Sequence, residues 1–181
     1  MTAPADTRAL LIETIADAFA DVEYPGDADL TSSKYGEEPA ALIVDFKGKT
    51  DWRVLDAVFL NQAPDGWGTA LSFFSDNALW FYLPAYLIAD IRNELDAAND
   101  PAVRLCSSLT VLGEQQKVSQ QWGGGTMGDR ARASFARFSP AQVSAIVAYL
   151  HWRLERVDGG DIVIEQALDN YWNDRNASPE V

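Results

Sequence analysis

Cysteine and histidine are almost missing from this chain of 181 residues, where Cys106 and His151 are the only members of their types. A lone cysteine excludes a disulfide within the chain, and one cysteine with one histidine does not supply the ligands of an ordinary zinc site. The loop at 27–38 has acids at three EF-hand positions, but Ser32 stands where the calcium loop requires glycine. The sequence therefore predicts no metal site and no cofactor.

Nucleophilic catalysis has equally little support in the sequence. His151 lies near the end of a predicted helix and has no serine or cysteine neighbour that would complete a triad. We expect it on the helix surface or at a cap. Cys106 lies in an apolar run and is expected to be a buried structural thiol. We assign no catalytic residue.

Positive charge is scarce, because 14 Lys and Arg residues face 27 Asp and Glu residues and leave a net charge of −13. Such a chain repels phosphate backbones and anionic lipid surfaces, so neither nucleic acid nor a membrane is an expected partner. Two interpretations of the acidity remain. It keeps a soluble protein dispersed, or it attracts a basic protein.

Long hydrophobic runs are also missing. The longest apolar run, at 78–89, is shorter than the roughly 20 residues that a spanning helix needs. The N-terminus lacks the basic and apolar regions of a secretory signal. We therefore expect a cytoplasmic protein.

Aromatic and aliphatic residues are abundant, and a hydrophobic fraction of 48% predicts a folded chain. Few segments alternate with a period of two residues, whereas helical spacing recurs. The sequence predicts an all-α fold, or a mainly α fold with at most a minor sheet. We expect one compact domain over 1–181, a bundle of about six to eight helices, with 1–5 and 174–181 frayed.

Capping residues locate several helices. The first is expected to begin after Asp6 or Thr7 and to end before Pro25. Ser139 and Gln142 form a capping box with Pro140 in the first helical position. Further helices are expected over 37–46, from a Thr50 cap through Phe59, over 101–112, and after a cap at Asp161.

The segment 71–95 is rich in aromatic residues. Ser75 is its expected N-cap, and Pro84 is expected to interrupt the helix or restart it, because proline lacks a backbone donor. Trp80, Tyr82 and Tyr86 are candidate binding residues, since they either line a ligand pocket or form an interface. Core packing is the alternative.

A polar stretch at 114–133 carries three consecutive glycines at 123–125 and is expected to be a mobile loop. It lacks the lysine and the spacing of a phosphate-binding loop. Arg130, Arg132 and Arg137 form the only local basic cluster. They are candidate anion ligands, with pairing to the acidic surface of the same chain as the alternative.

Several of these motifs occur together in one known family. The run Ser72-Phe73-Phe74-Ser75, then Ala78, then Tyr82-Leu83-Pro84-Ala85-Tyr86-Leu87, resembles the central signature of an uncharacterised bacterial family known only as a domain of unknown function. Flanking patterns near 48–55 and 138–146 resemble that family too, so the resemblance covers most of 9–155. It is weakest in the stretch 114–133. The resemblance implies a small bacterial helical protein and supplies no activity.

Three hypotheses of function follow from the sequence. The leading one is a non-enzymatic acidic protein that binds a basic protein partner, as an immunity or inhibitor protein does. The second is an enzyme with an unfamiliar site of carboxylates and arginines near the 114–138 loop. The third is a structural subunit.

Overall fold

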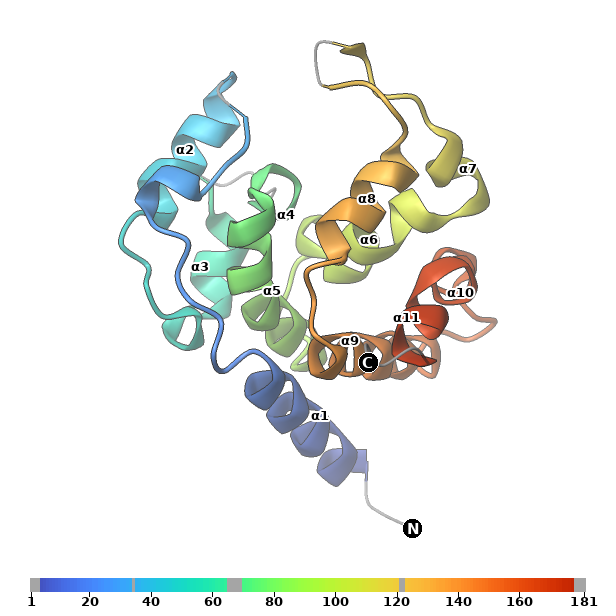
Figure 1. Ribbon diagram of the computed structural model, residues 1–181. Coiled ribbons are helices and arrows are strands. Elements are labelled where there is room, and N and C mark those ends of the chain that lie inside the picture. The colour runs from blue at the N-terminus through green and yellow to red at the C-terminus, as the bar shows by residue number, and fades with distance from the viewer. Residues whose placement is uncertain (1–3, 34, 65–69, 121–122, 178–181) are drawn as a thin grey trace. The chain divides into compact units, whose positions relative to one another are not determined.

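The computed structural model describes residues 4–33, 35–64, 70–120 and 123–177 (Figure 1). Its contacts divide the chain into two compact units, Met1–Pro101 (unit 1) and Ala102–Val181 (unit 2). The described residues form helices and two isolated β-bridges, with no strand among them, which confirms the mainly α prediction. These residues contain more α-helices than the six to eight expected, because several expected helices are divided.

Unit 1 is organised around its longest helix, α5. Its α-helices are α1 (Pro4–Ala18), α2 (Glu37–Phe46), α3 (Ala57–Gln62), α4 (Ala70–Phe73) and α5 (Asp76–Ile91). Almost every side chain in the middle of α5 is buried, and α1 and the 3-10 turn Trp52–Val54 pack against it. The α2 prediction is confirmed at both ends.

Helix α5 runs without a break through Pro84, so the expected interruption was wrong. Proline inside a helix costs about 3 kcal/mol or more, partly because one backbone donor is lost. Each large apolar side chain that becomes buried contributes about 1.5–3 kcal/mol. Leu83 and Leu87 on either side of Pro84 are buried, and this burial outweighs the loss.

Both ends of α5 are capped. The Ser75 hydroxyl accepts a hydrogen bond from the Ala78 N–H at 3.0 Å, which confirms the predicted N-cap. At the other end Asn93 has a φ of 65°, and the Glu94 N–H reaches back to the Ala89 carbonyl at 3.0 Å. This is the left-handed C-terminal motif that stops a helix.

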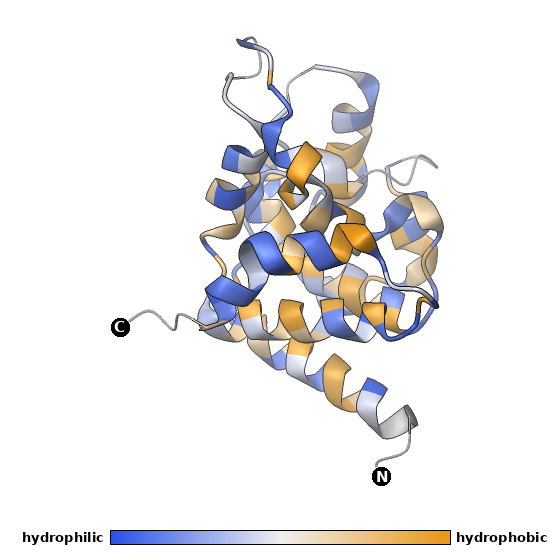
Figure 2. Cartoon of the chain, turned by 90° about the vertical axis from the view of Figure 1, so that its right-hand side faces the viewer, coloured by the Kyte–Doolittle hydropathy of each residue, from blue (hydrophilic) through white to orange (hydrophobic). Residues whose placement is uncertain are grey.

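Helix α1 begins at Pro4, earlier than the predicted cap at Asp6 or Thr7. Proline is favoured in the first helical position because its missing donor has no partner there. Apolar and polar residues alternate along α1 (Figure 2), as one buried and one solvated face require. No described helix combines the length and the apolar character that crossing a membrane requires.

The expected helix at 50–59 is also divided. Asp51 caps a short 3-10 turn at Trp52–Val54, and Asp56 caps α3 by accepting a hydrogen bond from the Phe59 N–H at 2.8 Å. Two aspartates that each bond local backbone donors start two short elements instead of one helix.

Unit 2 contains α6 (Pro101–Cys106, which starts at the unit boundary), α7 (Val111–Gln115), α8 (Met127–Phe135), α9 (Pro140–Leu154), α10 (Ile162–Ala167) and α11 (Asn173–Ala177). A π-helix, Leu168–Trp172, joins α10 to α11. The helix expected over 101–112 is divided, because α6 ends at Cys106, a 3-10 turn follows at Ser107–Leu109, and Thr110 then caps α7 by accepting from the Gly113 N–H at 3.0 Å. The Cys106 side chain is buried, as predicted.

The capping box of α9 is confirmed. The Ser139 hydroxyl accepts from the Gln142 N–H at 3.3 Å, and the Gln142 side chain accepts from the Ser139 N–H at 2.9 Å. The Asp161 cap of α10 is confirmed as well. His151 lies exposed in the last turn of α9.

Helices α7 and α8 occupy the two ends of the stretch 114–133, which was expected to be a loop. Helix α7 extends to Gln115, and α8 begins at Met127. The Thr126 hydroxyl caps α8, because it accepts a hydrogen bond from the Asp129 N–H and donates one to the Asp129 carboxylate. An isolated bridge pairs Lys117 with Thr126. The glycines at 123–125 have φ values of 97°, 67° and 77°, a left-handed conformation that glycine adopts without strain. Backbone conformation therefore explains this glycine run.

Parts of both ends that were expected to fray lie in helices. Residues 4–5 already belong to α1, and residues 174–177 belong to α11. The other residues that were expected to fray, 1–3 and 178–181, lie outside the described part.

Candidate functional site

The aromatic candidates Tyr82 and Tyr86 lie in the core of unit 1. Both side chains are buried. The Tyr82 ring stacks on Phe74 with centroids 5.1 Å apart, and its hydroxyl donates to the Lys49 carbonyl at 2.8 Å. Burial raises the pKa of both tyrosines above the ordinary value. These two residues therefore act in packing and offer no open surface.

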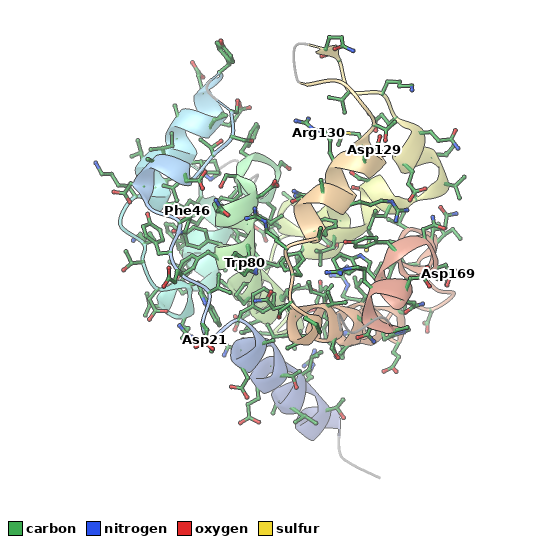
Figure 3. The ribbon with its side chains drawn as sticks, viewed as in Figure 1. Asp21, Phe46, Trp80, Asp129, Arg130 and Asp169 are labelled. Carbon is green, nitrogen blue, oxygen red and sulfur yellow. The ribbon has the colours of Figure 1, made fainter. Side chains whose placement is uncertain are left out.

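Trp80, the third aromatic candidate, is half-buried on α5 (Figure 3). It lies outside the lining of the pocket that α5 helps to form in unit 1. The structure therefore does not gather Trp80, Tyr82 and Tyr86 into one open site.

The three candidate arginines do not form one anion site either. Arg130 and Arg132 are two positions apart on α8, so their side chains leave the helix about 200° apart. Arg130, labelled in Figure 3, is exposed, and so is Arg137 beyond the end of α8. Arg132 is partly buried.

Arg132 is engaged by three neighbours. Its guanidinium pairs with the Glu114 carboxylate of α7 and donates from both terminal nitrogens to the Asn170 carbonyl, at 3.2 Å each. It also lies 5.3 Å from the centre of the Tyr171 ring. Asn170 and Tyr171 belong to the π-helix, whose widened turn is typical of functional or strained positions. Arg132 thus joins α7, α8 and the π-helix.

A polar pocket of about 430 Å³ opens beside this arginine in unit 2. Its lining residues are Glu114, Gln115, Lys117, Thr126, Gly128, Asp129 and Arg132. A β-carbon on Gly128 would lie 2.9 Å from the Glu114 Cα, so the glycine lets α7 and α8 approach closely. Two carboxylates and a lysine in one pocket are suited to hydrogen bonding of a small polar molecule.

A second, apolar pocket of about 540 Å³ lies in unit 1 between α1, the 3-10 turn Trp52–Val54, α3 and α5. Its lining residues are Ile12, Ala16, Trp52, Arg53, Leu55, Asp56, Ala57, Val58, Ala85, Ile88, Ala89, Arg92 and Glu94. Sequence reasoning missed it because the lining residues come from four separate elements. The alanines at 85 and 89, one helical turn apart, are the only local signal of a hollow.

The exposed part of this lining is mostly charged, because Arg53, Asp56, Arg92 and Glu94 are exposed and Val58 is the one exposed apolar residue of the lining. Val58 lines the pocket and is 65% exposed, and Val54 in the adjoining turn is 73% exposed. The Arg53 guanidinium is occupied locally, since it stacks 4.6 Å from the Trp52 ring, pairs with Asp51 at 3.4 Å and donates to the Ala20 carbonyl at 3.1 Å. Asp56 and Glu94 supply acidic groups to the lining.

Charge is distributed very unevenly between the two units. Residues 1–101 hold 18 Asp and Glu against 6 Lys and Arg, a net charge of −12, whereas residues 102–181 hold 9 against 8, a net charge of −1. Every acidic side chain of unit 1 whose burial the structure describes is exposed or half-buried. Unit 1 therefore presents a strongly negative surface.

One acidic group of unit 1 is tied to its surroundings. The Tyr24 hydroxyl donates to Asp27 Oδ1 at 2.5 Å, and the Gly48 N–H donates to the same oxygen at 2.9 Å. These two hydrogen bonds hold the pKa of Asp27 below its ordinary value. Burial, and then the bond to Asp27, raise the pKa of Tyr24 to about 12. The pair links the loop before α2 to the turn after it.

Comparison with known proteins places the chain in a group without an assigned role. A family model, described as a family of unknown function (DUF6714), matches residues 7–176. This match confirms the resemblance to a family of unknown function. No curated protein and no solved structure matches the chain.

Proposed function

We propose that this chain, which belongs to the family of unknown function DUF6714, is a non-enzymatic binding protein whose unit 1 engages a cationic protein. The charge asymmetry carries the proposal, because unit 1 has a net charge of −12 and unit 2 a net charge of −1. Such a field attracts a basic surface and accelerates association with it. Salt screens the attraction over about 8–10 Å at physiological ionic strength.

Helix α1 and the turn after it carry a regularly spaced stripe of this acidic surface. Glu13, Asp17 and Asp21 follow one another at four-residue intervals and are all exposed. Asp21, labelled in Figure 3, lies just beyond the helix end. Like charges at this spacing destabilise a helix by about 0.2–0.5 kcal/mol per pair, and Glu13 with Asp17 is such a pair inside α1. A stripe that costs stability supports a role in binding.

The test compares two charge variants of the full chain. In the first, Glu13→Gln, Asp17→Asn and Asp21→Asn remove three charges from unit 1. In the matched control, Asp158→Asn, Asp169→Asn and Asp174→Asn remove three exposed charges from unit 2. Each protein is immobilised and exposed to a lysate of its native cell in about 50 mM and about 500 mM salt, within the range where surface charges are screened.

We expect the wild type and the unit 2 control to retain the same cationic protein at low salt and to release it at high salt. The unit 1 variant is expected to retain about tenfold less. Retention of no specific protein by the wild type, or equal losses in the two variants, would contradict the proposal.

A second candidate function is an enzyme that uses the polar pocket of unit 2. Glu114, Asp129 and Lys117 line one cavity within the segment 114–138, and this grouping favours the hypothesis. Asp129→Asn and Lys117→Met are expected to change the metabolite profile of the native cell. Unchanged profiles in both variants, with the protein folded and present at normal levels, would count against an enzyme.

A further inference from the structure

We infer that the apolar pocket of unit 1 receives an apolar side chain of the cationic partner, so that recognition combines one hydrophobic anchor with surrounding basic residues. The inference rests on the proposed function and assigns the partner's chemistry. The occupant is a segment of a partner protein in which lysine or arginine residues flank a leucine-like residue.

The pocket has the size and the lining that an anchor requires. Its volume of about 540 Å³ falls within the roughly 300–1,000 Å³ of typical binding clefts. Ala85 and Ala89 leave space above α5, and Ile88 between them adds an aliphatic surface. Binding hot spots are characteristically such apolar hollows, which are dehydrated when one anchor fills them.

An exposed valine of the lining, Val58, and a second exposed valine in the turn that contributes Trp52 and Arg53 to the lining, Val54, point to a macromolecular occupant. Val54 and Val58 are both largely exposed, and Val58 lines the pocket directly. A small molecule that binds entirely inside the pocket would leave the side chains of Val54 and Val58 exposed to water. A chain segment that crosses the edge covers them as well, which adds apolar area to the contact.

The charges around the pocket select a cationic segment. Ile12 and Ala16 of α1 line the pocket, and each is followed immediately by an exposed acid, Glu13 and Asp17. The lining itself is balanced, with Asp56 and Glu94 against Arg53 and Arg92, so the selection comes from the net charge of −12 that unit 1 carries around the pocket. A partner with basic residues on both sides of its anchor places them against these carboxylates, whereas an acidic partner is repelled.

The closing experiment uses two synthetic peptides with the full-length protein. The first is a 14-residue amphipathic helix of about equal numbers of leucine and lysine, with leucines at i, i+3, i+4 and i+7, the spacing of helix-in-groove ligands. The second has the same lysines, and serine replaces every leucine. Binding to each is followed by fluorescence anisotropy of a labelled peptide at low and high salt.

Two protein variants address the pocket and one serves as a control. Ala16→Leu fills the hollow from α1, and Val58→Ser removes the exposed apolar side chain of the lining, at a position where folding is little affected. Val44→Ser changes a valine of α2 that is 75% exposed and lies outside the pocket lining. Circular dichroism confirms that each variant is folded.

We expect the wild type and Val44→Ser to bind the leucine peptide about tenfold more tightly than the serine peptide, the ratio expected from one buried aliphatic anchor. Ala16→Leu and Val58→Ser remove most of this preference and leave the salt-sensitive binding of the serine peptide unchanged.

Equal binding of the two peptides by the wild type, or a preference that survives in both pocket variants, would overturn the anchor inference. In either case salt-sensitive binding of the serine peptide that depends on Glu13, Asp17 and Asp21 would leave the proposed function standing. Failure of the wild type to bind either peptide at low salt would overturn both.

Discussion

Arg132 holds together three parts of unit 2, so its replacement tests the packing there. Arg132→Ala removes two hydrogen bonds to the Asn170 carbonyl, the ion pair with Glu114 and the contact with the Tyr171 ring. The ion pair is partly exposed and contributes little. We expect the free energy of unfolding in urea to fall by about 1–2 kcal/mol.

Two further variants give the losses of unfolding free energy with which Arg132→Ala is compared. Arg132→Lys keeps the charge but lacks the planar fork that reaches both partners, and an intermediate loss is expected. Arg130→Ala, at an exposed position of the same helix, is expected to change stability by less than about 0.5 kcal/mol. A loss for Arg130→Ala as large as that for Arg132→Ala would contradict this role.

Tyr82 and Tyr86 form a matched pair of buried phenols with different hydrogen bonding. The Tyr82 hydroxyl donates to the Lys49 carbonyl, whereas the buried Tyr86 hydroxyl has no hydrogen-bond partner among the described residues. Tyr82→Phe is expected to lower the free energy of unfolding by about 1 kcal/mol. Tyr86→Phe removes an unsatisfied group and is expected to leave stability unchanged or raise it by up to about 1 kcal/mol. Urea unfolding of both variants checks the difference.

The contact between Tyr24 and Asp27 predicts stability changes at both ends of the pH scale. Tyr24 has its pKa raised from 10.0 to about 12, so its contribution is present below pH 10 and is lost as pH rises through about 12. Asp27 has its pKa lowered from 3.8, so its contribution is present above pH 3.8 and is lost as pH falls further. Tyr24→Phe removes the shared hydrogen bond and is expected to reduce both slopes.

The measurement is the free energy of unfolding against pH for the wild type and Tyr24→Phe, because groups common to both proteins cancel in the difference. Tyr35→Phe, at an exposed tyrosine of the same unit, serves as the control. Identical slopes for the wild type and Tyr24→Phe in both pH ranges would contradict the prediction.

At the scale of one element, α9 offers a direct test of its capping box. Ser139→Ala removes the acceptor for the Gln142 N–H, and it is expected to lower the free energy of unfolding by about 1 kcal/mol. Ser144→Ala changes an exposed serine inside the same helix and is expected to raise stability by a few tenths of a kcal/mol, because alanine is the better helix former. Thermal unfolding of both variants, followed by circular dichroism, distinguishes the cap from the serine itself.

Local chemistry decided which elements could be predicted from the sequence. The caps at Ser75, Ser139 and Asp161 were predicted because each depends on residues within three positions of the helix start. The continuity of α5 through Pro84 was not, because it depends on burial by other elements. The division of the helix expected over 101–112 was missed although its signal is local, because Thr110 caps α7 through the Gly113 N–H and Gly113 packs closely against the Ser107 carbonyl, six positions earlier.

The candidate site was predictable only in its charge. Acidity is a property of composition and was evident from the sequence, but its concentration in unit 1 required the boundary near Pro101. The apolar pocket is formed by residues of several elements between α1 and α5, so the pattern of a single segment does not predict it. Arg132 was a candidate anion ligand in the sequence, and its partners Glu114 and Asn170 could not be predicted because they lie 18 and 38 positions away.

For the whole molecule, the excess of negative charge predicts that salt stabilises the fold. Unit 1 carries a net charge of −12 within about one hundred residues, so its carboxylates repel one another in the compact state. Raising sodium chloride from about 20 mM to about 500 mM shortens the screening length several-fold. We expect the urea midpoint of unfolding to rise over this range. A midpoint that stays constant or falls would contradict the prediction.

Glu13, Asp17 and Asp21 take part in this repulsion, so Glu13→Gln with Asp17→Asn and Asp21→Asn is expected to raise the midpoint at low salt and to reduce its salt dependence. The unit 2 control, with Asp158, Asp169 and Asp174 changed to asparagine, has nearly balanced charge around it and is expected to respond less.

Because the Cys106 side chain is buried, the rate of its chemical modification can be used to measure local unfolding of unit 2. As the only thiol in the chain, it gives a single labelling reaction, and that reaction requires solvent to reach the interior of unit 2. The rate at which a thiol reagent modifies the unaltered protein therefore measures how often this unit exposes its interior under native conditions. Addition of a cationic partner that binds unit 1 alone would leave this rate unchanged, whereas coupling between the units would appear as a slower reaction.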